Sequence, residues 1–491
     1  MTTRFTIAGA IAVLAIAGCS SSSNSNIDDN FVPPPQTPVS NARVQVLHAS
    51  PDAPAVNIRG IAAGPIGPVD YKTGGGAITV PTGTYDGIEV FGILPGGAET
   101  MDPVLALPSL TLEENTLYTV IATGKDIDLS PSFFFAQEDT PVDPMMTRVR
   151  VAHAAPDAGE VSVFLTAPGA PLDMSAMPVI TFDVGGVMET FAEVPAGQYQ
   201  VRVTGAVAPM TAPGPVVYDS GEITLPGGAS LTIAAVENTT SADTLRMDES
   251  PITLIIMDGA GSSELIDQRN PEAEIRVVHA SASTPSVDVI VNGDRMMPFV
   301  PNLTFPNFVP APLGFVPVAE DAYDIVVTDS DTQTLEPIAL EQFALNGGVT
   351  YDVIAFNEFP GVEGIVLEDD YRRIDTAAKL RAFHASVVAQ NLTADIGGVD
   401  IYVQPPTVTD LSTVAPTVPG VELGDNTGFL QLPPDQDWVV SITAAGDSAP
   451  LIQSPTVNLA AGGIYTAIAR DPDPTVLNDV PGLILLDDFN D

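Results

Sequence analysis

The chain is poor in the residues on which most catalytic and metal sites depend. Its 491 residues include one cysteine, one tryptophan and four histidines. The lone Cys19 cannot form a disulfide within the chain, and clustered Cys and His ligands for zinc are missing. Successive histidines are 105, 126 and 105 positions apart, and no G-x-S-x-G motif offers a nucleophilic serine. The sequence therefore argues against zinc chemistry and nucleophilic catalysis, and it implies no cofactor.

Basic residues are also scarce, because 17 lysines and arginines face 62 acidic residues, for a formal net charge of −45. Such a chain repels phosphates and lacks a basic stripe with interleaved aromatics, which excludes nucleic-acid binding. The same charge excludes electrostatic docking on anionic lipids. A dense negative surface favours a soluble monomer, and it suits salty surroundings outside the cytoplasm because ions screen the self-repulsion.

The N-terminus has the pattern of an export signal. Residues 7–17 form an apolar stretch after Arg4, too short for a membrane span and typical of a signal peptide, here residues 1–18. The stretch ends in Ile-Ala-Gly-Cys and resembles the lipobox of bacterial lipoproteins, which implies that Cys19 is lipidated. Several acyl chains would give stable membrane anchoring. Ser20 stands where an inner-membrane retention signal carries Asp, so the resemblance implies the outer membrane, with the chain periplasmic or surface-exposed.

The rest of the chain reads as a tether followed by β-structure. Residues 19–40 are rich in Ser and Asn and then in Pro, which predicts a flexible segment with a stiffer end. Beyond it, short runs of Val, Ile and Thr alternate with turn residues, among 41 glycines and 46 prolines in the whole chain. This punctuation predicts an all-β protein, and the lack of long stretches with a 3.6-residue period argues against helices.

One segment occurs four times, and each copy contains one of the four histidines. The copies are RVQVLHASPDAP (43–54), RVRVAHAAPDAG (148–159), EIRVVHASASTP (274–285) and KLRAFHASVVAQ (379–390). Repeats of about 100 residues indicate tandem domains, because solenoid repeats are much shorter. We therefore expect four tandem antiparallel β-sandwich (immunoglobulin-like) domains, at 41–145, 146–260, 271–374 and 377–491.

The repeated segment RVQVLHASPDAPAVNI resembles the bacterial "domain of unknown function 4397" family. That resemblance implies extracellular β domains in tandem, without an established activity. The first two copies follow the pattern well. The third has Ser283 where the first two have Asp52 and Asp157, and the fourth inserts VVAQNLTADIGG before its second strand.

The repeated histidines His48, His153, His279 and His384 all fall on the same face of their strands. Because side chains alternate in a strand, Val44 and Val46 share the face of His48, and the other copies have the same phase. The opposite face carries Arg150, Arg276 and Arg381 in the later copies. We expect each imidazole to be half-buried, neutral and hydrogen-bonded to the turn that follows it. The alternative is one ligand-binding or proton-transfer site per repeat.

Two further groups of residues are candidate structural or functional sites. An aromatic residue recurs later in each repeat, and we expect Tyr85, Tyr199, Tyr323 and Trp438 to be core residues rather than carbohydrate platforms. Acidic pairs follow two equivalent strands, namely Asp126 with Asp128 and Asp471 with Asp473. Alternate carboxylates can bind calcium, but the spacing does not fit an EF-hand, so these four residues are weak candidates.

These observations predict a lipid-anchored envelope protein with non-catalytic domains that bind, adhere or act as spacers. A surface glycan or a protein is the expected ligand, and the lipid anchor supplies the membrane contact. The alternatives are a carbohydrate-active hydrolase, for which any acidic chain offers carboxylate pairs, and a calcium-stabilised binding protein. The modules could also act as two pairs, one with two and three with four, with a ligand in each cleft.

Overall fold

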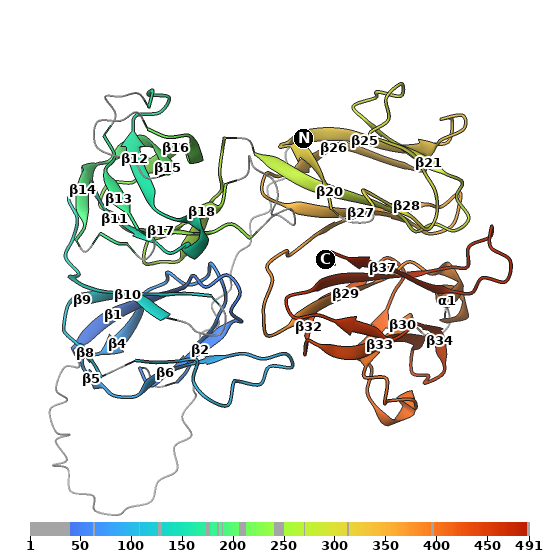
Figure 1. Ribbon diagram of the computed structural model, residues 1–491, viewed down its shortest axis with the longest axis horizontal. Coiled ribbons are helices and arrows are strands. Elements are labelled where there is room, and N and C mark those ends of the chain that lie inside the picture. Colours follow the sequence, from blue (N-terminus) through green and yellow to red (C-terminus); the bar gives the residue numbers. More distant parts are fainter. Residues whose placement is uncertain are drawn as a thin grey trace, which may run out of the picture. The chain divides into compact units, whose positions relative to one another are not determined.

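The described part of the chain is almost entirely β-structure (Figure 1). This computed structural model describes residues 40–488 except 62–63, 108, 126–129, 173–176, 184–185, 189, 206–212, 240–249, 270, 312–313 and 394–396. The predicted all-β class, with multiple antiparallel sheets, is confirmed. The predicted signal peptide, Cys19 and the tether up to residue 39 lie outside the described residues.

Each sequence repeat contributes two sheets, and we call the repeats module 1 (41–145), module 2 (146–260), module 3 (271–374) and module 4 (377–491). One sheet of each module contains the strand that ends in the repeated histidine, and we call it the histidine sheet. The other is the second sheet. By its internal contacts, the chain from Ser40 onward clusters as a single unit, so independent folding of each module remains a prediction.

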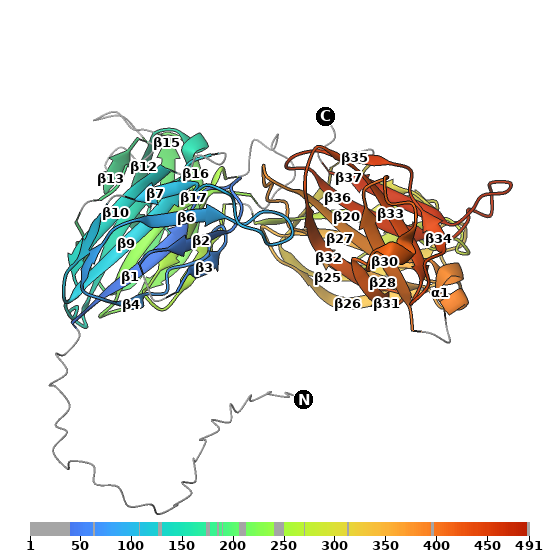
Figure 2. The same cartoon turned by 90° about the horizontal axis from the view of Figure 1, so that it is seen from below.

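The histidine sheets share one strand order. In module 1 it is β4 (Ile78–Pro81), β1 (Asn41–His48), β9 (Thr116–Thr123) and β10 (Ser130–Glu138), which can be followed in Figure 2. In module 2 it is β14 (Ala192–Pro195), β11 (Met146–His153), β17 (Ser230–Glu237) and β18 (Ile252–Met257), and β19 (Ser262–Leu265), just beyond the predicted boundary at residue 260, adds a fifth strand. In module 3 it is β23 (Phe308–Val309), β20 (Glu272–His279), β27 (Thr350–Phe356) and β28 (Glu363–Glu368), with β24 (Val316–Ala319) also on β20. In module 4 it is β32 (Asn426–Leu432), β29 (Ala378–His384), β36 (Ile464–Arg470) and β37 (Gly482–Asp487).

The second sheets are equally regular. Module 1 has the order β3 (Ile66–Val69), β2 (Val56–Arg59), β6 (Ile88–Gly92) and β7 (Leu105–Leu107), with β5 (Gly83–Tyr85) paired to β8 (Leu110–Leu112). Module 2 has β13 (Ile180–Phe182), β12 (Val161–Thr166), β15 (Gly197–Gly205) and β16 (Val216–Leu225). Module 3 has β22 (Val300–Leu303), β21 (Val287–Val291), β25 (Asp321–Asp329) and β26 (Ile338–Leu345). Module 4 has β31 (Val418–Val421), β30 (Val399–Gln404), β33 (Gln436–Ala444) and β34 (Pro450–Gln453), with β35 (Val457–Leu459) on β33.

One ladder in every histidine sheet is parallel. The histidine strand runs parallel to the central strand beside it, and each histidine pairs with an alanine there, as in His48 with Ala122 and His384 with Ala469. Modules 2 and 3 repeat this register. Residue alternation fixes which face a side chain takes but not the direction of the neighbouring strand, so the sequence could not reveal this ladder.

The two sheets of each module enclose an apolar core. The core-facing residue four positions before each histidine is Val44, Val149, Ile275 or Leu380, and each belongs to the core cluster of its own module. The alternation of strand residues therefore assigns this face correctly. Burying β-branched and aliphatic side chains from both sheets is the main stabilising term for such a sandwich.

A second apolar layer lies between histidine sheets of neighbouring modules. Leu47 and Tyr71 of module 1 share a buried cluster with Ala152 and Ile255 of module 2. Val278 and Phe356 of module 3 share another with Phe383 and Leu486 of module 4, in which the rings of Phe356 and Phe383 meet edge to face. The modules thus associate as two pairs, as one of the sequence alternatives supposed, but packed side chains occupy the interfaces where that alternative expected clefts.

A short helix, α1 (Val387–Thr393), interrupts the β-structure in module 4. It lies in the insertion VVAQNLTADIGG and is too short to produce a recognisable helical period. Ser386 precedes the helix, and its hydroxyl accepts a hydrogen bond from Ala389 N at 3.2 Å. Capping of the first turn in this way stabilises a helix that few internal hydrogen bonds support.

Candidate functional site

All four histidines are buried at the ends of their strands, and three of them are hydrogen-bonded to the turns that follow, as predicted. His48 Nε2 donates to the carbonyl oxygen of Pro54 at 2.9 Å, and its Nδ1 accepts from Ser50 N at 3.3 Å. His279 makes the same pair of contacts with Pro285 O and Ser281 N. His153 Nε2 donates to Gly159 O at 2.7 Å. In all three the carbonyl belongs to the sixth residue after the histidine, which is the geometry that a strand-to-turn link requires.

Within the described ranges, module 4 does not make the predicted hydrogen bond from its histidine to the turn. The sixth residue after His384 is Gln390, which lies in α1, and in the described residues no backbone carbonyl accepts from the His384 ring. Burial lowers the pKa of His384 to about 4, and the nearby Gln390 side chain opposes this shift, although neither ring nitrogen has a hydrogen-bond partner in the described part of the chain. The inserted helix therefore places Gln390 where the other modules have the accepting carbonyl.

Burial also lowers the pKa of the other three histidines, to about 4 for His48. All four are thus neutral at pH 7, in the direction that the sequence predicted. Each is at most 1% exposed, so burial is complete where half-burial was predicted, and none is poised to exchange a proton with solvent.

The repeated aromatic residues form corner hydrogen bonds. The hydroxyls of Tyr85, Tyr199 and Tyr323 each donate to the carbonyl oxygen four residues earlier, at 2.7–2.8 Å. The Trp438 indole donates to Pro433 O at 3.2 Å, five residues earlier. This geometry resembles the tyrosine corner of β-sandwiches. Because these polar atoms are used within the corner, the aromatic residues support the strand in each module.

The faces of the histidine strands that look away from their own cores carry the arginines. Arg276 and Arg381 are buried at the interface of modules 3 and 4, together with Asp352. Arg276 binds both oxygens of Asp352, at 2.7 and 3.0 Å, and Arg381 Nη2 donates to Asp352 Oδ2 at 2.7 Å. One carboxylate thus receives an arginine from each module.

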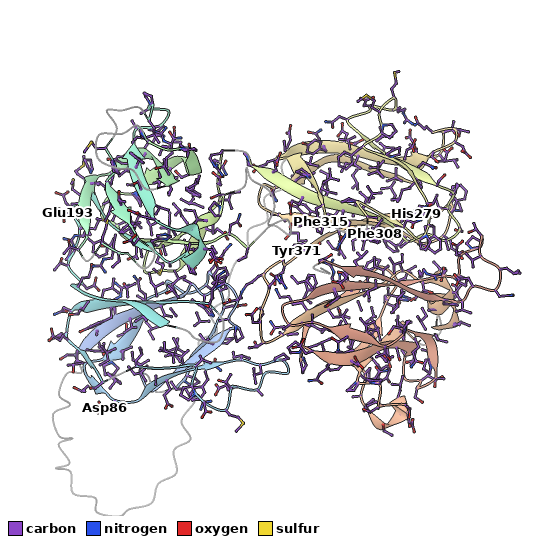
Figure 3. All side chains as sticks on the ribbon, in the orientation of Figure 1. Asp86, Glu193, His279, Phe308, Phe315 and Tyr371 are labelled. Carbon is purple, nitrogen blue, oxygen red and sulfur yellow. The ribbon has the colours of Figure 1, made fainter. Side chains whose placement is uncertain are left out.

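Two more carboxylates and a tyrosine complete this network. Asp369 Oδ1 lies 2.5 Å from Arg381 Nη2, and Asp488 forms an ion pair with Arg276. The Tyr371 hydroxyl donates to Asp488 Oδ2 at 3.1 Å. Its ring packs edge to face on Phe315, with centroids 5.0 Å apart, and both residues are labelled in Figure 3. Burial, reinforced by the charge of Asp352, raises the pKa of Asp369 well above its usual range.

The arginine position has a common second partner. The guanidinium groups of Arg150, Arg276 and Arg381 lie over the rings of Phe191, Phe315 and Phe429, at 4.2–4.7 Å from the ring centroids. Module 1 has Gln45 at this position, and its amide donates to Thr119 Oγ1 at 2.7 Å. Residues on the central strand opposite these four positions are Thr119, Thr232, Asp352 and Thr466. Sequence reasoning noted the arginines and missed Asp352, although an acid inside the strand TYDVIAF was a usable signal.

The weak calcium candidates separate into described and undescribed pairs. Asp126 and Asp128 lie outside the described residues. Asp471 is buried and accepts from Ser386 Oγ, Val387 N and Val388 N at 2.5–3.1 Å, which caps α1. Asp473 accepts from the backbone and hydroxyl of Thr475. Across the described ranges, no group of three or more His, Cys, Asp or Glu residues is placed to hold a metal ion.

An open groove lies between the two sheets of module 4. Its volume is about 390 Å³. Leu380, Val440 and Leu459 are buried at its floor, and Leu483 and Leu485 line it from β37. Arg470 and Asp479 also line it and pair with each other at 2.6 Å. No sequence motif predicts this groove, because it results from a break in one strand rather than from a set of polar residues.

The fold and this geometry define a class, a tandem all-β protein whose repeated polar residues are used within the structure. The sequence profile of the family described as "Domain of unknown function (DUF4397)" matches residues 40–164 and 273–394, which together make up half of the chain. The chain therefore belongs to this family. The first matched region contains module 1 and the second contains module 3 from residue 273, and each also contains the histidine strand of the packing partner.

Comparisons with individual proteins add little to this assignment. No curated protein matches the chain. The Bacillus anthracis TIE protein is 10% identical over 89% of this chain and 69% of its own, with a TM-score of 0.13. A structure described as a "putative cell adhesion protein" from Bacteroides uniformis is 10% identical over 47% of this chain and 99% of its own, with a TM-score of 0.17. At these TM-scores neither likeness supports a conclusion about function.

Within the described residues, no helix has the length and apolar character needed to cross a membrane.

Proposed function

We propose that this protein is a lipid-anchored envelope protein whose paired β-sandwich modules present non-catalytic binding surfaces. The observation that carries the proposal is the burial of the four histidines. All four are buried, and burial lowers their pKa, so they are neutral at pH 7. Three of them donate to a carbonyl of their own turn. General acid–base catalysis by these residues would need access to substrate, which this burial denies them.

The pairing of modules supports a rigid presentation of such surfaces. Apolar clusters join module 1 to module 2 and module 3 to module 4. A further contact joins the pairs, since Arg372 Nε donates to Pro51 O at 2.9 Å and its guanidinium lies 5.0 Å from the Tyr71 ring centroid. Together with the lipobox at Cys19, these contacts favour a monomer held at the outer membrane through its N-terminal lipid.

The anchor is tested by labelling with a palmitate analogue in a Gram-negative host, followed by separation of inner and outer membranes. We expect the full chain to be labelled and to sediment with the outer membrane, and Cys19→Ser to lose both properties. Ser20→Asp is the matched control, which should keep the label and move the protein to the inner membrane. An unlabelled wild-type chain would refute the proposed anchor.

A further inference from the structure

The groove of module 4 opens where one strand of the second sheet is interrupted. In module 3 the corresponding strand, β26, is continuous over Ile338–Leu345. A Cβ built on Gly364 of β28 would lie 3.1 Å from the Ile338 side chain, so the two sheets meet there. In module 4, β34 ends at Gln453 and β35 begins at Val457, and Pro455 lies in the interval. Proline cannot donate to a ladder, which accounts for the break.

The residue at the position of Gly364 in module 4 is a leucine that the core covers only in part. Gly364 pairs with Ala355, and the matching pair in module 4 is Leu483 with Ala469. Leu483 and Leu485 point to the same face of β37 because side chains alternate. Both line the groove, and Leu485 is 39% exposed. An apolar residue on the core-facing side of a sandwich strand is normally covered by the other sheet, so the exposure of Leu485 marks a place where that cover is incomplete.

Apolar surface continues from the groove onto the loop before β37. Val480 lines the groove and is 66% exposed, and Val476 and Leu477 of the same loop are 53% and 90% exposed. A contiguous exposed apolar patch beside a concave site is typical of a binding surface. Val480 and Leu485 therefore extend the apolar lining of the groove to the solvent, and the loop before β37 adds exposed apolar side chains at Val476 and Leu477.

The strands that border the groove are both last in their sheets. β37 ends the order β32-β29-β36-β37, and β34 ends the order β31-β30-β33-β34. An edge strand presents backbone groups that can pair with an added strand. A peptide laid along the six residues of β37 would place about three alternate side chains toward the groove.

The charge around the groove favours an occupant that carries positive charge. Asp487 of β37 lies on the same face of that strand as the groove-lining Leu483 and Leu485. Arg470, the basic residue of its lining, is already paired with Asp479. The chain as a whole carries a formal charge of −45. Lysine or arginine beside the apolar side chains of the occupant is therefore favoured, and carboxylates are repelled.

We propose that this groove binds an extended basic segment of a partner polypeptide, which adds to the free edge of β37 and inserts alternate apolar side chains between the sheets. This inference rests on the proposed non-catalytic binding function and names its partner class. A glycan fits less well, because the lining is mostly aliphatic and the Trp438 ring is only 9% exposed.

The test uses the full chain in detergent and a fluorescent peptide of alternating Leu and Thr with two lysines at each end. One control peptide carries glutamates in place of the lysines, and another carries Pro in place of Thr. We expect the lysine peptide to bind at least about tenfold more tightly than either control, because the first reverses the charge and the second cannot form a ladder. Equal binding of the three peptides, or binding of none, would overturn the proposal.

Two variants place the peptide in the groove. Leu485→Glu and Val480→Glu should each weaken binding at least about tenfold, since a carboxylate enters an apolar site. Leu392→Glu is the matched control, because Leu392 is 63% exposed on α1 and does not line the groove. An unchanged peptide affinity in both groove variants would refute the site. The proposal would also be refuted if the protein self-associates or binds an oligosaccharide and the same two variants abolish that activity. Palmitate labelling of the same preparation tests the anchor separately, so failure of one proposal is distinguishable from failure of the other.

Discussion

The carboxylate of Asp352 in module 3 accepts a hydrogen bond from Arg381 of module 4 at 2.7 Å, while it binds Arg276 of its own sheet through both oxygens. At the corresponding position the other three modules have threonine. Asp352 is therefore the substitution that turns a repeated position into a charged contact across a module interface. At the interface of modules 1 and 2, the equivalent arginine contacts a neutral residue instead. Arg150 Nη2 of module 2 donates to the amide oxygen of Gln137 in module 1 at 3.5 Å.

Replacement of Asp352 by the threonine of the other modules should destabilise the second pair strongly. Asp352→Thr leaves two buried arginines without their shared acceptor, and breaking a buried ion pair in this way costs about 3–5 kcal/mol. Urea unfolding of the full chain should show the loss in the transition that reports on modules 3 and 4. Asp86→Asn, at an exposed residue of module 1 labelled in Figure 3, is the control. A loss below about 1 kcal/mol would show that the arginines find other acceptors.

Asp369 should make stability fall as pH rises. Its pKa in the folded protein is raised well above the ordinary value, so between the two values the folded chain holds a proton that the unfolded chain has released. Stability contributed by this group is present below the unfolded pKa and is lost as pH rises. Asp369→Asn stays neutral at every pH. The unfolding free energy of the variant minus that of the wild type should therefore increase from pH 5 to pH 8, and a flat difference would contradict the assignment.

His48 should give the opposite pH dependence. Its pKa falls to about 4 on folding, from about 6.5 in an unfolded chain. The unfolded state binds more protons between these values, so stability is lost as pH falls below about 6.5. A shift of this size corresponds to about 3 kcal/mol when fully expressed. His48→Gln, whose amide can still donate to Pro54 O, should remove this loss between pH 7.5 and pH 4.5. Equal pH slopes for the variant and the wild type would mean that the ring is already charged or exposed.

The corner hydrogen bonds should each contribute a modest amount to stability. Tyr199→Phe removes the hydroxyl that donates to Pro195 O at 2.8 Å and keeps the ring. We expect a loss of about 0.5–1.5 kcal/mol in unfolding free energy, typical of one intramolecular hydrogen bond. The equivalent changes at Tyr85 and Tyr323 should give similar losses. If the losses in unfolding free energy differ widely among the three modules, the packing of the ring, and not the hydroxyl, determines the effect.

The sequence predicted those features that depend on local patterns and missed those that depend on partners. Alternation assigned the histidines to the core face and the arginines to the opposite face, because this needs only the period of a strand. The partner of Arg381 is Asp352, 29 positions away and in another module, and no local pattern identifies such a pair. The groove could not be predicted from the sequence for a related reason. A proline between Gln453 and Val457 opens it only because a second sheet lies opposite.

Pairs of modules, rather than single modules, should be the smallest stable fragments. Module 3 alone would expose Val278, Ile354 and Phe356, which the interface buries, and it would leave Asp352 without Arg381. Residues 271–491 keep both halves of that interface, and residues 40–269 keep the cluster around Leu47 and Ile255. We expect both two-module fragments to unfold cooperatively, and residues 271–374 to melt at least about 10 °C lower or to aggregate, because small domains tolerate little loss of burial. Thermal unfolding and amide hydrogen exchange of the three fragments check this, with slow exchange expected in β20 and β27 only when module 4 is present. If residues 271–374 melt as residues 271–491 do, each module folds by itself and the interface is dispensable for stability.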